Sequence, residues 1–204
     1  MEIIDVIQGS EEWFKCRAGI PTASQFSKIV TSSGEISRSM RDLALNLASQ
    51  VIVTELEEMP TSYAMERGSE LEFEAVEKYQ TYTLNPVQTV GFMSCGDYGY
   101  SPDGLIGEDG LLEIKCPLQK NHAKYLSKKE VPSEYRAQVQ GGLYVSDREW
   151  CDFVSYNPTF KTDYQMLVVR EYRDEEFIRS LGKAIKKCIE IRDEILEKIK
   201  GEKK

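Results

Sequence analysis

Acidic residues lie inside two closely spaced apolar segments near the middle of this 204-residue sequence. Residues 98–106 and 111–116 have the pattern of β-strands, and the turn sequence Glu108-Asp109-Gly110 separates them. Asp103 lies toward the end of the first predicted strand, and Glu113 lies inside the second. Facing side chains on adjacent antiparallel strands are about 5 Å apart, so the pattern predicts two carboxylates held side by side.

Such a carboxylate pair has the chemistry of a magnesium site. Mg²⁺ prefers hard oxygen ligands, which include backbone carbonyls such as that of Ile114. Lys115 follows Glu113 by two positions on one strand, so both side chains face the same side. Lys115 would then lie beside the metal, where it could orient or deprotonate a water or stabilise phosphate charge. The alternative is a solvated Glu113–Lys115 pair on a surface strand, but the rest of this strand is apolar.

Helical patterns precede and follow the two strands. We expect helices at residues 10–17, 23–30, 69–82, 122–127, 132–144 and 174–199, and one that begins at Ser37 and is closed by Met59-Pro60. Ser10 is the expected N-cap of the first helix. Further strands are expected at residues 87–94, 150–156 and 164–170. This order of elements predicts a single mixed α/β domain over residues 1–204.

The charge balance narrows the class of function. The net charge of −8 argues against a non-enzymatic DNA coat or bending protein, which needs a broad basic face. A nuclease can be acidic, because bound cations neutralise the carboxylates of its metal site. A basic-leaning segment follows the candidate site and contains Lys115, Lys120, Lys124, Lys128, Lys129 and Arg136.

Cysteine and histidine are too sparse for several other chemistries. The five cysteines are scattered singly, which argues against zinc, iron–sulfur and disulfide frameworks. His122 is the only histidine, so His-dependent nucleophilic catalysis is also unfavoured, and we expect this residue at a helix start or on the surface. No apolar run is long enough for a membrane span or a signal peptide, so a cytoplasmic protein is expected.

The string SPDGLIGEDGLLEIKCP resembles the lambda exonuclease (YqaJ viral recombinase) family of the PD-(D/E)xK nuclease superfamily. RAGIPTAS at 17–24, RGSELEFEAVEKY at 67–79 and YRAQVQGGLYV at 135–145 are similar to the same family in the same order. The resemblance implies a restriction-endonuclease-like mixed central sheet flanked by helices. It places the catalytic core at about residues 65–160, followed by the long C-terminal helix at about 174–199.

The resemblance also implies roles for individual residues. Asp103 and Glu113 would be metal ligands with the Ile114 carbonyl, and Lys115 would be the catalytic lysine. Glu72 would be a further acid near the metals, although composition alone does not separate it from Glu70.

A glutamine of the helix at 132–144 is also implicated. Only one of Gln138 and Gln140 can face the site, because they are about 200° apart on a helix. The family pattern favours Gln138 as the catalytic residue and leaves Gln140 as a polar surface residue. Gln140 with Tyr144 resembles a pattern of related recombination nucleases, which keeps that alternative open.

Four other residues match family positions that bind a terminal 5′-phosphate: Arg17, Ser24, Ser101 and, as a secondary candidate, Thr22. A guanidinium forks onto phosphate oxygens, and hydroxyl groups at a helix N-terminus complete an anion site. Without the resemblance, Arg17 would be a surface charge and Ser24 a helix cap. Trp13 is expected to be a core or helix-packing residue.

The predicted function is Mg²⁺-dependent 5′→3′ exonuclease action on linear double-stranded DNA, which leaves 3′ single strands for phage-type recombination. Two Mg²⁺ ions per site are expected, with Mn²⁺ as an expected substitute. The resemblance also implies a homotrimeric ring around DNA with a 5′-phosphorylated end, and a single-strand annealing protein as a partner. The alternatives are a structure-specific or restriction-type endonuclease on the same fold and a non-catalytic DNA-binding protein. The pattern of the C-terminal helix leaves open whether it packs on the core, seals a subunit interface or docks a partner.

Overall fold

The computed structural model of the chain describes residues 1–54 and 63–201, and its strands form two sheets. The larger sheet has the order β2-β5-β6-β7-β8, and the smaller has the order β1-β3-β4. The strands are β1 (Glu2–Ile4), β2 (Val87–Gln88), β3 (Phe92–Ser94), β4 (Gly99–Tyr100), β5 (Gly104–Ile106), β6 (Gly110–Lys115), β7 (Trp150–Tyr156) and β8 (Met166–Tyr172). The helices are α1 (Glu11–Arg17), α2 (Met40–Ile52), α3 (Tyr63–Thr83), α4 (Gln119–Lys128), α5 (Ser133–Ser146) and α6 (Glu175–Gly201), with 3₁₀ helices η1 (Ala23–Lys28) and η2 (Thr162–Tyr164).

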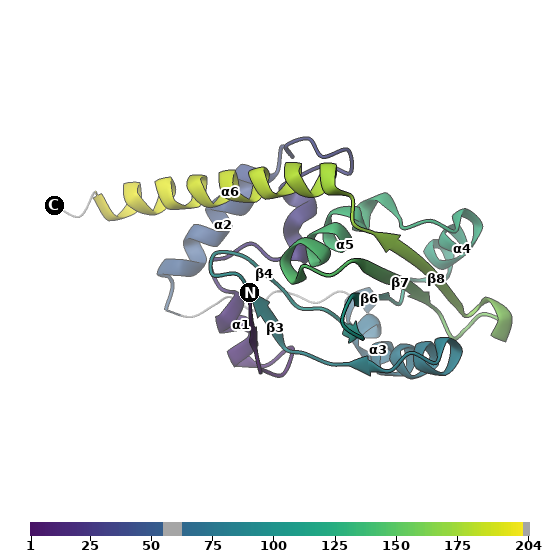
Figure 1. Cartoon of the computed structure of the whole chain (residues 1–204). Coiled ribbons are helices and arrows are strands. Elements are labelled where there is room, and N and C mark those ends of the chain that lie inside the picture. The colour runs from purple at the N-terminus through teal and green to yellow at the C-terminus, as the bar shows by residue number, and fades with distance from the viewer. Residues whose placement is uncertain (55–62, 202–204) are drawn as a thin grey trace.

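The larger sheet is mixed, as the sequence predicts. β5 and β6 form an antiparallel hairpin, whereas β6 and β7 run parallel and β8 returns antiparallel to β7. Parallel neighbours need a long crossover connection, and α4 and α5 form it. Figure 1 shows the sheet between α5 on one side and α3 on the other.

The two faces of β6 belong to different cores. Leu111 belongs to the larger core with Leu143 of α5, whereas Leu112 and Ile114 belong to the smaller core with Tyr79 of α3. Because side chains alternate along a strand, Glu113 and Lys115 share the face of Leu111 and therefore point to the α5 side. The alternation thus introduces two charged side chains into an otherwise apolar layer.

The long C-terminal helix is confirmed and packs on the chain's own core. Phe177, Leu181, Ile185 and Cys188 of α6 are buried, and the helix runs along α2 (Figure 1). Asp174 caps its N-terminus, since Asp174 Oδ1 accepts the backbone N–H of Phe177 at 3.0 Å. Of the three roles left open for this helix, packing on the core is therefore present within one chain.

Two predicted strands were each too long. Residues 87–94 divide into β2 and β3, and residues 98–106 divide into β4 and β5, with the members of each pair in different sheets. A Cβ on Gly91 would lie 2.1 Å from the Val6 carbonyl oxygen, so the chain passes the N-terminal segment too closely to continue as one strand. Pro102 has no N–H for a ladder and marks the second break. Asp103 therefore directly precedes β5 instead of lying near the end of a strand.

Smaller differences concern element type and ends. Residues 23–28 form a 3₁₀ helix, and Tyr164 belongs to η2 because β8 begins only at Met166. β1 has no counterpart among the predicted strands. The predicted helix from Ser37 corresponds to α2, and its proposed end at Met59-Pro60 lies outside the described residues. Within residues 1–54 and 63–201, no helix has the length and apolar character required to cross a membrane.

Candidate active site

The β5–β6 hairpin brings Asp103 opposite Glu113. Gly104 pairs with Leu112, so Asp103 and Glu113 face each other one position beyond the ladder. Asp103 Oδ2 accepts the backbone N–H of Ile114 at 2.5 Å, which ties the preceding loop to the end of β6. The hairpin therefore places both predicted carboxylates together, although Asp103 is not itself a strand residue.

Glu113 is fully buried and accepts three hydrogen bonds. The Tyr100 hydroxyl donates to Oε2 at 2.9 Å, while Lys115 Nζ at 2.5 Å and the Gln138 amide donate to Oε1. A buried carboxylate is costly unless hydrogen bonds and an opposite charge compensate it, and these donors supply both. The arrangement places Lys115 and Gln138 against one carboxylate oxygen of Glu113.

Glu72 approaches the same charges from α3. Burial raises the pKa of Glu72, the charge of Lys115 opposes this effect and the charge of Glu113 adds to it. Burial also raises the pKa of Asp103 well above its ordinary value, and the negative charges of Glu113 and Glu72 raise it further. Glu72 is thus within electrostatic reach of the hairpin, whereas Glu70 is exposed.

The donor types at the site, carboxylate and carbonyl oxygens, are those that suit a hard divalent cation. Among the residues that the structure describes, no group of three His, Cys, Asp or Glu side chains is arranged to hold a metal ion. The negative charges of Glu72 and Glu113 nevertheless repel that of Asp103 and so raise its pKa. A bound divalent cation relieves such repulsion. Carboxylate and backbone carbonyl oxygens are also the ligands that Mg²⁺ prefers.

Lys115 carries a stable positive charge in this arrangement. Burial lowers the pKa of Lys115, but the charges of Glu113 and Asp103 outweigh burial and raise the pKa above its ordinary value. The ammonium also lies 5.2 Å from the centre of the Tyr135 ring, at cation–π distance. As placed, Lys115 is equipped to stabilise negative charge on a phosphate instead of accepting a proton.

The predicted phosphate-binding residues form a second polar cluster. Arg17 Nη1 donates to Ser101 Oγ at 2.9 Å, and its Nη2 lies 3.4 Å from Thr22 Oγ1, which in turn lies 3.3 Å from Ser24 Oγ. Burial lowers the pKa of Arg17 to about 10, and no described carboxylate forms an ion pair with its guanidinium. A half-buried cation without an acidic partner among the described residues is suited to bind an anion.

The two clusters line one cavity of about 200 Å³. Its lining comprises Gln8, Trp13, Arg17, Thr22, Ala23, Ser24, Tyr100, Ser101, Asp103, Glu113, Lys115 and Gln138. One water occupies about 30 Å³, so the cavity has room for a phosphate group together with bound water. Glu72 does not line the cavity and reaches the site only through its charge.

Sequence reasoning missed four residues of this lining: Gln8, Trp13, Ala23 and Tyr100. The Trp13 indole N–H donates to Ser101 Oγ at 2.8 Å, and its ring lies 3.8 Å beneath the Arg17 guanidinium, so Trp13 is a cavity residue as well as a packing residue. Gln8 Nε2 donates to the carbonyls of Val90 and Pro102, and no sequence signal indicates this contact. Tyr100 could have been found from its position directly before the SPDG motif.

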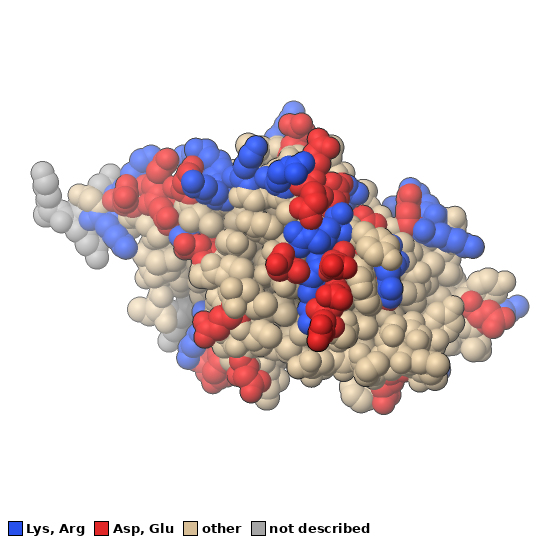
Figure 2. All heavy atoms as spheres, in the orientation of Figure 1, with Lys and Arg blue, Asp and Glu red and all other residues tan. Residues whose placement is uncertain are grey.

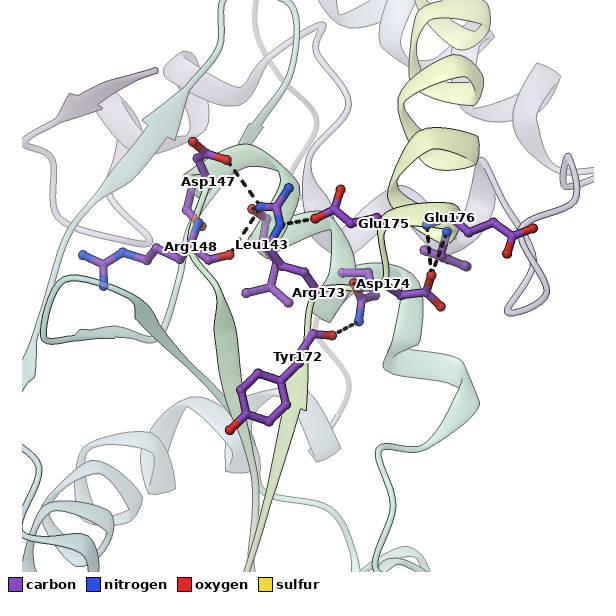
Figure 3. A network of polar contacts seen from close by, with 11 residues as sticks. Leu143, Asp147, Arg148, Tyr172, Arg173, Asp174, Glu175 and Glu176 are labelled. Atoms are coloured by element: carbon purple, nitrogen blue, oxygen red, sulfur yellow. Dashed lines mark hydrogen bonds and ion pairs between the residues drawn. The ribbon is translucent and has the colours of Figure 1, made fainter.

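Gln140 lies outside the site and links α5 to α6. It is fully buried, its Oε1 accepts the Asp174 N–H at 2.9 Å, and its Nε2 donates to the Tyr172 carbonyl at 2.8 Å. The expectation that the second glutamine is a surface residue is therefore wrong. Figure 3 shows this junction, where Arg173 also donates to the Leu143 carbonyl at 2.8 Å.

His122 is also not a surface residue. It is fully buried in α4, with Nδ1 2.7 Å from Ser155 Oγ and Nε2 2.8 Å from the Tyr164 carbonyl. These contacts connect α4 to β7 and η2, and none reaches the cavity. The prediction that His122 is not a site residue agrees with this position, whereas the predicted exposure was wrong because a single His in a polar helix gives no burial signal.

Comparison with known proteins places the chain in a family. A model of the YqaJ-like viral recombinase domain matches residues 12–149. The chain is 32% identical to an alkaline exonuclease from Laribacter hongkongensis, with a TM-score of 0.86 over 94% of this chain and 96% of that one, and a structure of the same exonuclease in complex with dAMP matches equally. A phage-related exonuclease from Haemophilus somnus 129PT shares the fold at 13% identity, with a TM-score of 0.73 over 88% and 96% of the two chains. No curated protein matches the chain significantly. The chain belongs to the family of the YqaJ-like viral recombinase domain.

Proposed function

We propose that the chain is a metal-dependent exonuclease that degrades linear double-stranded DNA from 5′ to 3′ and leaves a 3′ single strand for recombination. The observation that carries this proposal is the cavity shared by Asp103, Glu113 and Lys115 with the Arg17 guanidinium. Among the described residues, no carboxylate pairs with that guanidinium. Membership in the YqaJ-like family and the likeness to an alkaline exonuclease support exonuclease chemistry. That exonuclease has also been solved with dAMP, and a nucleoside monophosphate is the product that exonucleolytic cleavage releases.

The 5′→3′ direction of degradation would follow from the polar cluster around Arg17. Arg17 and Ser101 would bind a terminal 5′-phosphate, with Ser24 and Thr22 completing the polar wall. A terminal phosphate carries more negative charge than a phosphate inside the strand and has no strand continuing on its 5′ side, so the Arg17 cluster would favour a strand end. Because Ser101 is two residues before Asp103, binding of the end would bring the adjacent phosphodiester to the carboxylates.

Asp103, Glu113 and the Ile114 carbonyl would hold Mg²⁺, and Glu72 would contribute to a second ion, with Mn²⁺ able to substitute. When bound, Mg²⁺ supplies an activated water and stabilises the leaving oxygen. Lys115 would place its ammonium against the negative charge of the phosphate. The uncharged Gln138 amide would orient Lys115 or the attacking water without competing for the metal. Tyr100 keeps one Glu113 oxygen engaged and so limits how that carboxylate can rotate.

The proposal extends to assembly. A homotrimeric ring would confine duplex DNA without a strongly basic surface, which suits the net charge of −8. A single-strand annealing protein would receive the 3′ strand. The substrate would be the DNA of a bacterial host or its phage, so we propose that the enzyme acts in the bacterial cytoplasm.

Digestion of a linear duplex with and without a 5′-phosphate tests the proposal, with closed circular DNA as the comparison. We expect Mg²⁺-dependent loss of the linear duplex, faster with the phosphate, and no cutting of the circle. Lys115→Ala should lower the rate about 10²–10³-fold, the usual effect of removing a stabilising charge. Arg17→Ala should instead remove the preference for phosphorylated ends. Cutting of circular DNA would favour the endonuclease alternative, and undiminished activity of Lys115→Ala would exclude the proposed site.

A further inference from the structure

We propose that Lys120, Lys124 and Lys128 on α4, here named the α4 lysine stripe, bind the sugar–phosphate backbone of the duplex whose end occupies the cavity. This inference rests on the proposed function and adds a surface to it. None of the three lysines belongs to the cavity lining or to the predicted catalytic set.

The stripe is one face of a firmly attached helix. Its lysines recur every four residues, which keeps them within about 80° of one another on an α-helix. All three are exposed, whereas His122 and Tyr125, which lie outside the stripe, are buried. The His122 contacts with Ser155 and the Tyr164 carbonyl hold α4 on the sheet, so the lysines are presented by a rigid support.

The charge of this helix is opposite to that of the chain. The chain has a net charge of −8, yet α4 contains three lysines and no acidic residue. Within the described part of the chain, Lys120 and Lys124 form no ion pair, and Lys128 pairs only with Glu130, at 3.2 Å and with both side chains more than half exposed. Figure 2 shows blue side chains gathered over α4 at the right of the molecule. Such unneutralised charge attracts phosphates.

The position of α4 fits a duplex that starts at the cavity. Lys120 follows Lys115 by five residues, so their Cα atoms are at most about 18 Å apart. The stripe from Lys120 to Lys128 is about 12 Å long, since each helical residue rises about 1.5 Å. Phosphates of one strand rise about 3.4 Å each along the duplex axis while they wind around it, so a straight stripe of this length meets at most about three of them. A backbone leaving the cavity along α4 would therefore meet several lysines at once.

A binding experiment tests this surface apart from cleavage. Fluorescence anisotropy in a metal-free buffer with chelator measures the affinity for a short linear duplex with a 5′-phosphate. For the triple variant Lys120→Gln, Lys124→Gln, Lys128→Gln we expect weaker binding and a slope of log K against log salt reduced by up to about 2.7, or 0.9 per phosphate contact. Between about 50 and 200 mM salt the wild type should then lose about 40-fold more affinity than the variant.

The matched control changes three exposed lysines of α6, Lys183, Lys186 and Lys198, to Gln. It alters net charge equally, so an equal loss of affinity in both triple variants would overturn the proposal. Glu130→Gln provides a test in the other direction, because removing the acid beside Lys128 should tighten binding. Unchanged affinity and slope in the α4 variant would also overturn it, and would leave the stripe as a surface for an acidic protein.

The outcome is separable from the proposed function. A wild type that binds DNA through the stripe but does not degrade it in Mg²⁺ contradicts the nuclease proposal and keeps the surface. If the wild type degrades phosphorylated ends and the stripe variant binds DNA with equal affinity, the nuclease proposal is kept and the proposed surface is contradicted. At saturating DNA, the α4 triple variant should retain its maximal rate and its preference for 5′-phosphate, because its substitutions lie outside the cavity.

Discussion

The surroundings of Asp103 in the candidate site oppose its ionisation. Its pKa is raised first by burial and then by the charges of Glu113 and Glu72, so ionising it in the folded protein costs free energy. An acid with a raised folded pKa stabilises the fold at pH values below its unfolded pKa of about 3.9, and that contribution is lost as pH rises through the folded pKa. At neutral pH without a cation, Asp103 is therefore a destabilising residue.

Asp103→Asn separates this cost from metal binding. We expect the variant to unfold at a higher temperature than the wild type in chelator, by about 2–4 °C for each kcal/mol gained at this chain length. We also expect it to lose the upward shift that Mg²⁺ produces in the wild type by binding the folded state. Thermal unfolding with and without Mg²⁺ measures both effects, with the exposed Asp109→Asn as control. An Mg²⁺ shift retained in Asp103→Asn would contradict its assignment as a ligand.

His122 allows a pH prediction because it is the only histidine. Burial lowers its pKa below 6.5, so the folded state holds the neutral ring. A depressed histidine pKa contributes stability above the unfolded value of about 6.5 that is lost as pH falls through that value toward the folded pKa. The ring resonance in an NMR titration should give a pKa below 6.5. A pKa at or above 6.5 would contradict the buried neutral ring.

At the scale of elements, α5 is shaped by the side chains it covers. A Cβ on Gly142 would lie 2.8 Å from the Tyr100 ring, whose hydroxyl donates to Glu113. Helix propensity alone favours alanine over glycine by about 1 kcal/mol, so packing and propensity oppose each other at this position.

Gly142→Ala tests which effect prevails. We expect the substitution to lower the free energy of unfolding by about 1–3 kcal/mol, the usual cost of overpacking a core. Gly68→Ala in α3 is the matched control, since a Cβ there meets nothing within 4 Å and should stabilise by about 0.5–1 kcal/mol. Urea unfolding of both variants measures the difference. Stabilisation by Gly142→Ala would mean that Tyr100 is not confined by α5.

For the molecule as a whole, α6 connects the C-terminal part of the chain to segments that come much earlier in the sequence. Its Leu181 and Cys188 are fully buried, and Arg192 Nη1 donates to the Gly19 carbonyl at 2.8 Å. Nη2 of the same guanidinium lies 3.0 Å from Asp97 Oδ1. The last buried residue of the helix is Leu196.

Two truncations test this dependence. A chain ending at Asp174 should show no cooperative thermal unfolding, because it loses a buried face of the larger core. A chain ending at Glu197 should unfold within a few degrees of the full chain, since the residues removed are exposed or outside the described part. Circular dichroism during heating distinguishes the two. Cooperative unfolding of the shorter chain would show that residues 1–174 fold independently of α6.

Local patterns were sufficient for much of this molecule. Strand 150–156 and the helix near 174–199 were predicted nearly as found, because their periodicity reflects which face is buried. The carboxylate pair was predictable for a related reason: one turn and a two-residue alternation set the relative positions of Asp103, Glu113 and Lys115. Family resemblance selected Glu72 and Gln138, which composition alone left undecided against Glu70 and Gln140.

Contacts between distant segments were not predictable in this way. The crossing of the N-terminal segment at Gly91 divided a strand that its own residues would have continued. The burial of Gln140 and His122, and the places of Gln8 and Trp13 in the cavity, depend on residues 34 to 94 positions away. The sequence alone thus determined the hairpin and its charges, because those interactions are local. Only the tertiary structure decided that Arg17 and Ser101 face the same cavity as Glu113, because the free energy that joins them comes from packing the whole core.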